Sequence, residues 1–191
     1  MGESLLEVDE DLLMDFNLLV SSSRGEESDA NSEIQYLLGE LGDRGAQTNY
    51  TLVSGLTVAK TGLAPVVVIE GLRAILRESP WKFRYVLKVK PVLSVVSCSI
   101  DEIISAVIGQ METVKEGQTF RVSVEKRRNE MSSKNIIDAV AAKVPRKVDL
   151  EKPGKLIMIE IIGSLAGVSI IEPSCILGVE KEKRAVTSQR S

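Results

Sequence analysis

The chain has 191 residues, 43% of them hydrophobic, a formal net charge of −3 and no histidine. These values are typical of a globular protein of one large or two small domains, and they exclude a protein that coats nucleic acid over its whole surface. The longest apolar stretch, residues 156–171, is shorter than the roughly 20 residues that span a bilayer, so we expect no membrane segment. The acidic start lacks the basic leader of a secretion signal, and we expect a cytoplasmic location.

The first half of the chain predicts alternating strands and helices. In order, we expect a strand at residues 16–22, a helix capped by Ser28, a hairpin that turns at Ser54 and Gly55, a helix that begins at Pro65 and ends before Pro80, and a strand at residues 83–92. The order strand, helix, strand, strand, helix, strand is that of a ferredoxin-like domain. We place this domain at residues 15–91, after an acidic N-terminal tail at residues 1–14.

The last strand of this half also carries cations. Strand alternation places Arg84, Lys88 and Lys90 on one face, with Lys88 and Lys90 roughly 6 to 7 Å apart. We therefore include these three side chains among the candidates for binding an anion.

The second half is also α/β. It predicts a helix that begins at Ser99, where Ser99 and Glu102 match the capping box, a strand at residues 119–125, a helix that is capped by Ser132 or Ser133 and ends at Pro145, and strands at residues 155–162 and 167–173. We place this domain at residues 92–184 and a charged C-terminal tail at residues 185–191. The fold class expected is therefore α/β (α+β) in two domains.

Charge is distributed unevenly along the chain. Residues 1–45 contain twelve acids and two bases, whereas residues 121–155 contain ten Lys or Arg against five Asp or Glu. The basic side chains gather on both sides of one predicted helix, where guanidinium and ammonium groups can bind phosphate oxygens and the helix N-terminus favours an anion. The candidates are Lys126, Arg127, Arg128, Asn129 and Lys134 before or at the start of the helix, and Lys143, Arg146 and Lys147 after it. Composition alone is equally consistent with a solvated charged face.

The sequence offers little for catalysis. The absence of histidine removes the commonest general base and zinc ligand, and no glycine-rich nucleotide-binding loop is present. Asp138, Asp149 and Glu151 are expected to be solvated, and Cys98 and Cys175 to be buried reduced thiols rather than metal ligands. We therefore expect no catalytic residue, no cofactor and no metal site.

The second half resembles a known family, the THUMP domain proteins. The resemblance rests on TFRVSVEKRRN, KNIIDAVAAKV, VDLEKPGKLIMIEIIG and GVSIIEPSCILGVEKEKR, in this order. It implies that the chain binds RNA, chiefly the acceptor-stem end of tRNA, and that the preceding ferredoxin-like domain takes part. The architecture is similar to that of stand-alone members that present tRNA to a separate cytidine N4-acetyltransferase, which implies tRNA and a tRNA-modifying enzyme as partners.

Two features of the sequence qualify how such a protein would work. Most of the seven aromatic residues fall at core spacing, so we expect recognition by shape and phosphate rather than by base stacking. The chain ends soon after ILGVEKEKR, so the acidic leader or the first domain would have to contact the partner enzyme. Two alternatives are an RNA-modifying enzyme with an unrecognised site and a protein-interaction scaffold.

Overall fold

A computed structural model describes residues 13–189 as two compact units, each with its own five-stranded sheet. Unit 1 comprises residues up to Pro91 together with residues from Ile176 onward, and unit 2 comprises Val92–Cys175. The α/β fold class is confirmed. The tail expected at residues 1–14 lies outside the described residues except for its last two positions. None of the described helices is long and apolar enough to cross a membrane.

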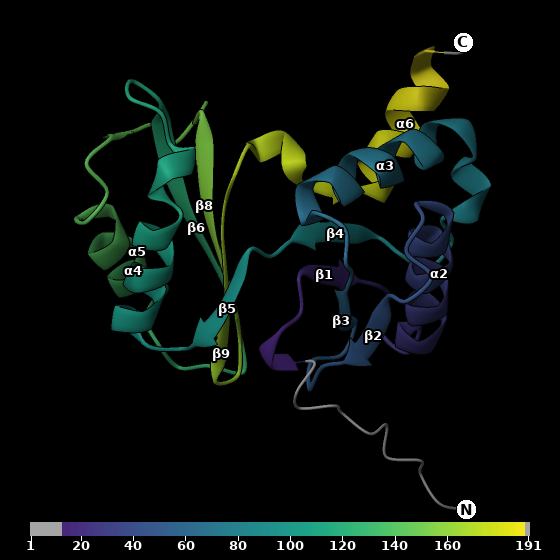
Figure 1. Cartoon of the computed structure of the whole chain (residues 1–191), viewed down its shortest axis with the longest axis horizontal. Coiled ribbons are helices and arrows are strands. Elements are labelled where there is room, and N and C mark those ends of the chain that lie inside the picture. Colours follow the sequence, from purple (N-terminus) through teal and green to yellow (C-terminus); the bar gives the residue numbers. More distant parts are fainter. Residues whose placement is uncertain (1–12, 190–191) are drawn as a thin grey trace, which may run out of the picture. The chain divides into compact units, whose positions relative to one another are not determined.

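Unit 1 is built on an antiparallel sheet with the strand order β10-β4-β1-β3-β2. Helices α2 and α3 pack on one face of this sheet and bury a core that includes Leu18, Ile34 and Leu72 (Figure 1). The order of its first four strands and two α-helices is the ferredoxin-like one. The elements are β1 (Leu18–Ser21), α2 (Glu27–Glu40), β2 (Gln47–Tyr50), β3 (Leu56–Lys60), α3 (Pro65–Glu78), the short 3-10 helix η1 (Pro80–Lys82) and β4 (Lys88–Pro91).

Local sequence explains several of these boundaries. Gly55 turns the β2–β3 hairpin at a φ of 76°, and a Cβ at this position would lie 2.9 Å from the Ser22 carbonyl oxygen. Pro65 occupies the first turn of α3, as expected. Helix α2 begins before Ser28, because Glu26 is its N-cap residue and no side chain caps it.

The strand expected at residues 83–92 is wrong in its first half. The backbone N–H groups of residues 84–86 donate to the Glu33 carboxylate at 2.8, 3.0 and 2.9 Å instead of to a neighbouring strand. Strand β4 therefore begins only at Lys88.

The end of the chain belongs to unit 1. Strand β10 (Leu177–Gly178) pairs with β4, and helix α6 (Val179–Gln189) follows it directly. Leu177 and Val179 lie in the core of unit 1, and Arg73 of α3 forms an ion pair with Glu182 at 2.9 Å. The domain boundary expected at residue 184 is thus corrected to residue 175, and the expected C-terminal tail is helical up to Gln189.

Unit 2 has the strand order β5-β9-β8-β6-β7. Strand β6 runs parallel to both β7 and β8, while β8 and β9 form an antiparallel hairpin. Helices α4 and α5 cover one face of the sheet (Figure 1). The elements are β5 (Ser94–Ser97), α4 (Ile100–Gly109), the 3-10 helix η2 (Met111–Thr113), β6 (Thr119–Arg127), α5 (Ser133–Ala141), β7 (Lys147–Val148), β8 (Lys155–Ile162), β9 (Leu165–Ile171) and the 3-10 helix η3 (Pro173–Cys175).

The predicted caps of unit 2 are confirmed. The Ser99 hydroxyl accepts a hydrogen bond from the Glu102 N–H, and the Ser132 hydroxyl accepts one from the Asn135 N–H. Phe120 faces the helices with no exposed surface, and Val122 and Val124 pack beside it. Strand β5 was not expected from the sequence, because its SVVS pattern is short.

Candidate nucleic-acid interface

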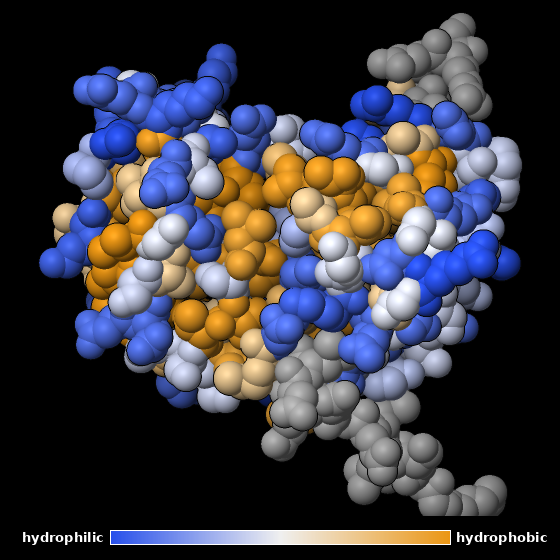
Figure 2. Space-filling model, in the orientation of Figure 1, coloured by the Kyte–Doolittle hydropathy of each residue, from blue (hydrophilic) through white to orange (hydrophobic). Residues whose placement is uncertain are grey.

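The basic candidates before α5 lie where β6 ends and the chain turns into the helix. Strands β6 and β8 run side by side to this end of the sheet, beside the β8–β9 turn at the bottom of the view (Figure 1), and hydrophobic and hydrophilic residues are mixed over this region in Figure 2. The turn is fixed where it leaves the strand, because the Gly163 N–H donates to the Arg127 carbonyl at 2.9 Å. The side chains that follow are therefore held at a defined position.

Arg127 has a structural role within unit 2. One of its terminal nitrogens donates to Glu160 at 2.9 Å and the other to Glu125 at 2.8 Å. Glu160 is only 1% exposed, so the Arg127 guanidinium compensates a buried carboxylate. Its positive charge is balanced by these two carboxylates within unit 2. We therefore remove Arg127 from the candidates for contacting a ligand.

Asn129 also has a structural role. Its side-chain amide donates to the Gly163 carbonyl at 2.8 Å, while its side-chain oxygen accepts from the Met131 N–H at 2.8 Å. The amide thereby ties the turn to the β8–β9 hairpin. Both ends of the side chain are occupied, so Asn129 shapes the turn.

Three exposed cations remain at this end of unit 2, and we call Lys126, Arg128 and Lys134 the β6–α5 cluster. Lys126 donates to the Met131 carbonyl at 2.7 Å, which leaves its charge uncompensated. Arg128 has a backbone φ of 54°, which lies in the left-handed region that residues other than glycine rarely adopt. Lys134 pairs with Asp138 at 2.5 Å, and the hydrogen bond that its ammonium donates to this carboxylate raises the pKa of Lys134.

The candidates after α5 lie at the opposite end of β6. Lys147 in β7 pairs with Thr119 at the start of β6, and seven residues at about 3.3 Å each separate this position from Lys126 by roughly 23 Å. Lys143 and Lys147 are exposed. The Arg146 guanidinium instead donates to the carbonyls of Val114, Lys115 and Pro145, so it serves the fold. The basic segment therefore forms two separate groups and not one continuous surface.

Two of the three candidates in unit 1, Arg84 and Lys88, are exposed, and the third, Lys90, is buried. Arg84 is exposed but precedes the strand, and its guanidinium lies 5.7 Å from the centre of the Tyr85 ring. Lys88 is exposed at the start of β4, whereas Lys90 is only 5% exposed. Strand alternation does not apply to Arg84, because residues 84–86 are held by Glu33 outside the sheet.

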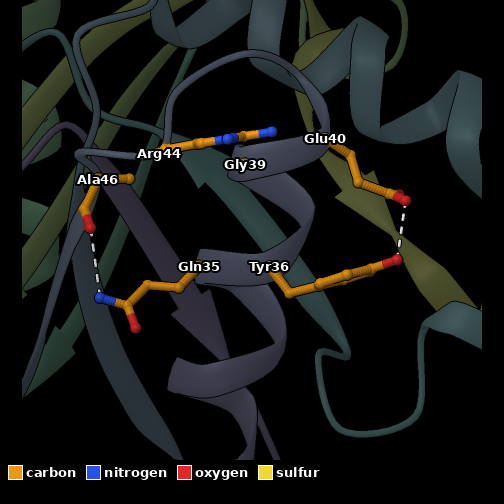
Figure 3. Close-up of a pocket in the computed structure, with 6 residues that line it drawn as sticks. All are labelled: Gln35, Tyr36, Gly39, Glu40, Arg44 and Ala46. Carbon is orange, nitrogen blue, oxygen red and sulfur yellow. Dashed lines mark hydrogen bonds between the residues drawn. The ribbon is translucent and has the colours of Figure 1, made fainter.

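Exposed aromatic side chains are a feature that sequence reasoning missed. Trp81 is 69% exposed and Tyr36 is 55% exposed, whereas all three phenylalanines are buried. Helix α2 and the segment after it form a hollow of about 640 Å³, lined by Gln35, Tyr36, Gly39, Glu40, Arg44 and Ala46. In this hollow the Tyr36 hydroxyl donates to Glu40 at 2.8 Å (Figure 3). The one available signal was the alternation of aromatic and basic residues in WKFRY.

Two groups considered for catalysis, Cys98 and Asp149, have neighbours in the structure that shift their pKa. Burial raises the pKa of the Cys98 thiol, although the Asn129 amide opposes this effect, so the thiol stays protonated. Asp149 caps the loop that follows β7, and the N–H groups of Lys152 and Glu151 lower the pKa of its carboxyl. Across the part of the chain that the structure describes, no group of three or more metal-ligating side chains is arranged to hold an ion.

Comparison with known proteins places this geometry in a family context. Residues 99–171 match the model of the THUMP domain, while none of the curated proteins matches the chain. Among solved structures, PH1313 from Pyrococcus horikoshii is 17% identical, with a TM-score of 0.55 over 83% of this chain and 55% of that one. TrmN from Thermus thermophilus is 16% identical, with a TM-score of 0.52 over 82% and 46%.

A predicted N6-adenine-specific DNA methylase from Listeria monocytogenes is 18% identical, with a TM-score of 0.51 over 88% of this chain and 42% of that one. At these identities the likeness is one of fold. The chain spans about half the length of the solved structures that it matches. The segment that matches the THUMP domain model, residues 99–171, runs from the cap of α4 to the end of β9.

Proposed function

We propose that the protein binds RNA, and specifically tRNA, through the β6–α5 cluster of its THUMP domain. The observation that carries this proposal is that the end of β6, the hydrogen-bonded turn and the start of α5 carry Lys126, Arg128 and Lys134 at one end of the sheet, within the segment that matches the THUMP model. Ammonium and guanidinium groups on a fixed turn suit phosphate oxygens, which they can bind with release of counterions. The family resemblance supports the acceptor-stem end of tRNA as the part that is held.

We further propose that the protein is not itself a catalyst and presents tRNA to a separate modifying enzyme. Support comes from the lack of histidine in the sequence and from the structural roles of Cys98 and Asp149. By family resemblance, a cytidine N4-acetyltransferase is the partner that we propose. No cofactor is needed for this role.

Charge-removal variants test the binding site. Replacing Lys126, Arg128 and Lys134 with alanine should weaken tRNA binding in a filter-retention assay by well over tenfold, because three phosphate contacts are removed. The matched control is the Lys143→Ala and Lys147→Ala double variant, which removes two exposed cations at the other end of β6. Equal affinities for the triple variant and the wild type would reject the β6–α5 cluster as the binding site.

An RNA-modifying enzyme is the second candidate, since one matched structure carries the name of a methylase. Incubation of the pure protein with tRNA and candidate group donors, followed by nucleoside analysis, separates the two proposals. Altered nucleosides formed by the pure protein would favour the enzyme, and their formation only after addition of a partner acetyltransferase would favour the presenting role. For the scaffold alternative, deletion of residues 1–14 should abolish partner binding while tRNA binding persists.

A further inference from the structure

Unit 1 displays a large aromatic side chain to solvent within a run of cations. Trp81 is 69% exposed, and residues 79–91 contain four bases and no acid. A tryptophan that is 69% exposed contributes little packing to its own domain, and surfaces that combine aromatic rings with cations are typical of single-stranded nucleic-acid binding. This combination identifies a second candidate surface, separate from the β6–α5 cluster.

The segment that carries Trp81 is held firmly in place. The Glu33 carboxylate accepts hydrogen bonds from the three N–H groups of residues 84–86, at 2.8 to 3.0 Å. Phe83 is 1% exposed, and the Lys183 ammonium donates to its carbonyl at 2.7 Å. The segment is therefore anchored to α2 on one side and to α6 on the other, while Trp81 and Arg84 stay exposed.

The neighbouring charges are also ordered. The Lys82 ammonium contacts Glu40 at 2.6 Å and lies 5.8 Å from the centre of the Tyr36 ring, so η1 adjoins the hollow on α2, whose lining residues Tyr36 and Glu40 are drawn in Figure 3. Arg44 is exposed and lines this hollow. Lys82 compensates the charge of Glu40, whereas the Glu33 carboxylate keeps its negative charge while the backbone N–H groups of residues 84–86 satisfy its oxygens.

The chemistry favours unpaired nucleotides over a duplex. Inside a duplex the faces of the bases are stacked on one another, whereas an unpaired base offers a face on which an aromatic ring can stack. We propose that unit 1 binds unpaired nucleotides of an RNA by stacking a base on Trp81, with Arg84 and Lys88 contacting the adjacent phosphates. This inference rests on the proposed function, because it takes RNA as the ligand.

The tryptophan itself reports the interaction, since Trp81 is the chain's only tryptophan. The intact protein is titrated with a single-stranded RNA of about ten nucleotides, a length within the range that one domain contacts, and separately with a blunt RNA duplex. We expect the single strand to quench Trp81 fluorescence with saturation, and the duplex to leave it unchanged. Absence of quenching by the single strand overturns the proposal and leaves the aromatic surface to a protein partner.

Substitutions give a second, independent test. Trp81→Ala should weaken binding of the single strand by about 5- to 140-fold, the range that corresponds to loss of one stacked base, whereas Trp81→Phe should retain most of the affinity. Leu52→Ala is the matched control, because Leu52 is 65% exposed in the same unit but lies in the β2–β3 turn. Unchanged affinity in Trp81→Ala, with circular dichroism showing a folded protein, contradicts the proposal.

The two proposals can fail separately. The alanine triple variant of the β6–α5 cluster should still show Trp81 quenching by the single strand. If tRNA binding depends on the β6–α5 cluster while Trp81 is not quenched, the stacking proposal is wrong and the proposed function stands. If Trp81 is quenched but the triple variant binds tRNA as the wild type does, the stacking proposal stands and the proposal that the β6–α5 cluster binds tRNA is wrong.

Discussion

Arg127 and Arg128 are adjacent in the sequence and have opposite roles. Arg127→Ala should lower the free energy of unfolding by about 1–3 kcal/mol, because it removes a hydrogen-bonded cation from the buried Glu160. Urea denaturation measures this loss, and the exposed Arg128→Ala should stay within about 0.5 kcal/mol of the wild type. If Arg127→Ala proved as stable as the wild type, the structural role assigned to Arg127 would be wrong.

A substitution of Arg128 by glycine should affect RNA binding without lowering the stability of the protein. The φ of 54° at Arg128 suits glycine, so Arg128→Gly should leave the melting temperature unchanged or slightly higher. The same substitution removes the guanidinium, so affinity for tRNA should fall by about tenfold, the effect of roughly 1.4 kcal/mol. Thermal unfolding and filter retention on the same sample check both effects, and a large loss of stability would contradict the description of this turn.

The sequence shows which residues are charged, but it does not predict whether a charged side chain is exposed or bonded within the fold. Three of the candidates are exposed as expected: Lys126, Arg128 and Lys134. Three others donate hydrogen bonds within unit 2: Arg127, Asn129 and Arg146. Each of Arg127 and Asn129 has one partner more than thirty residues away, Glu160 and Gly163 respectively. No local pattern reports such contacts, because they depend on how β6 and β8 pair.

A carboxylate that joins two loops of unit 1 makes the protein sensitive to acid. The hydroxyl of Thr61 and the N–H of Gly62 donate to Asp43 and lower the pKa of its carboxyl. A lowered pKa in the folded state contributes stability above the unfolded-state pKa of about 4, and this contribution is lost as the pH falls through the folded-state pKa. Asp43→Asn should therefore be less stable than the wild type at pH 6, and the difference should shrink towards pH 3 in denaturation curves.

The return of the chain to unit 1 through β10 and α6 can be tested in the core. Leu177 is fully buried and its strand pairs with β4, so Leu177→Ala should destabilise the protein by about 2–4 kcal/mol. Leu52→Ala, at an exposed position, should change stability by less than about 0.5 kcal/mol. Equal stabilities of the two variants would contradict the placement of residues after Cys175 in unit 1.

Elements with strong local signals could be predicted from the sequence, and elements held by distant contacts could not. Ser99, Ser132, Pro65 and Gly55 mark caps and turns that the structure confirms. Strand β4 is shorter than expected because Glu33 captures the preceding backbone, and β10 pairs with a strand almost ninety residues earlier in the chain. The exposure of Trp81 was missed for the same reason, since spacing alone does not distinguish an outward ring from a core ring.

For the whole molecule, the central claim is that an acidic protein binds RNA through a small set of clustered cations. Its net charge of −3 opposes a polyanion at long range, so binding depends on a few local phosphate contacts and should be sensitive to salt. The fold likeness to solved structures covers more than four fifths of the chain, but it does not locate these contacts. Binding measurements on the intact chain are therefore decisive.

The salt dependence of tRNA binding tests this claim most directly. We expect the logarithm of the association constant to fall linearly with the logarithm of salt concentration, with a slope that corresponds to roughly three to six phosphate contacts. In the Lys126, Arg128 and Lys134 alanine variant the slope should decrease by about three contacts. A wild-type slope near zero, or an identical slope in the variant, would contradict the account.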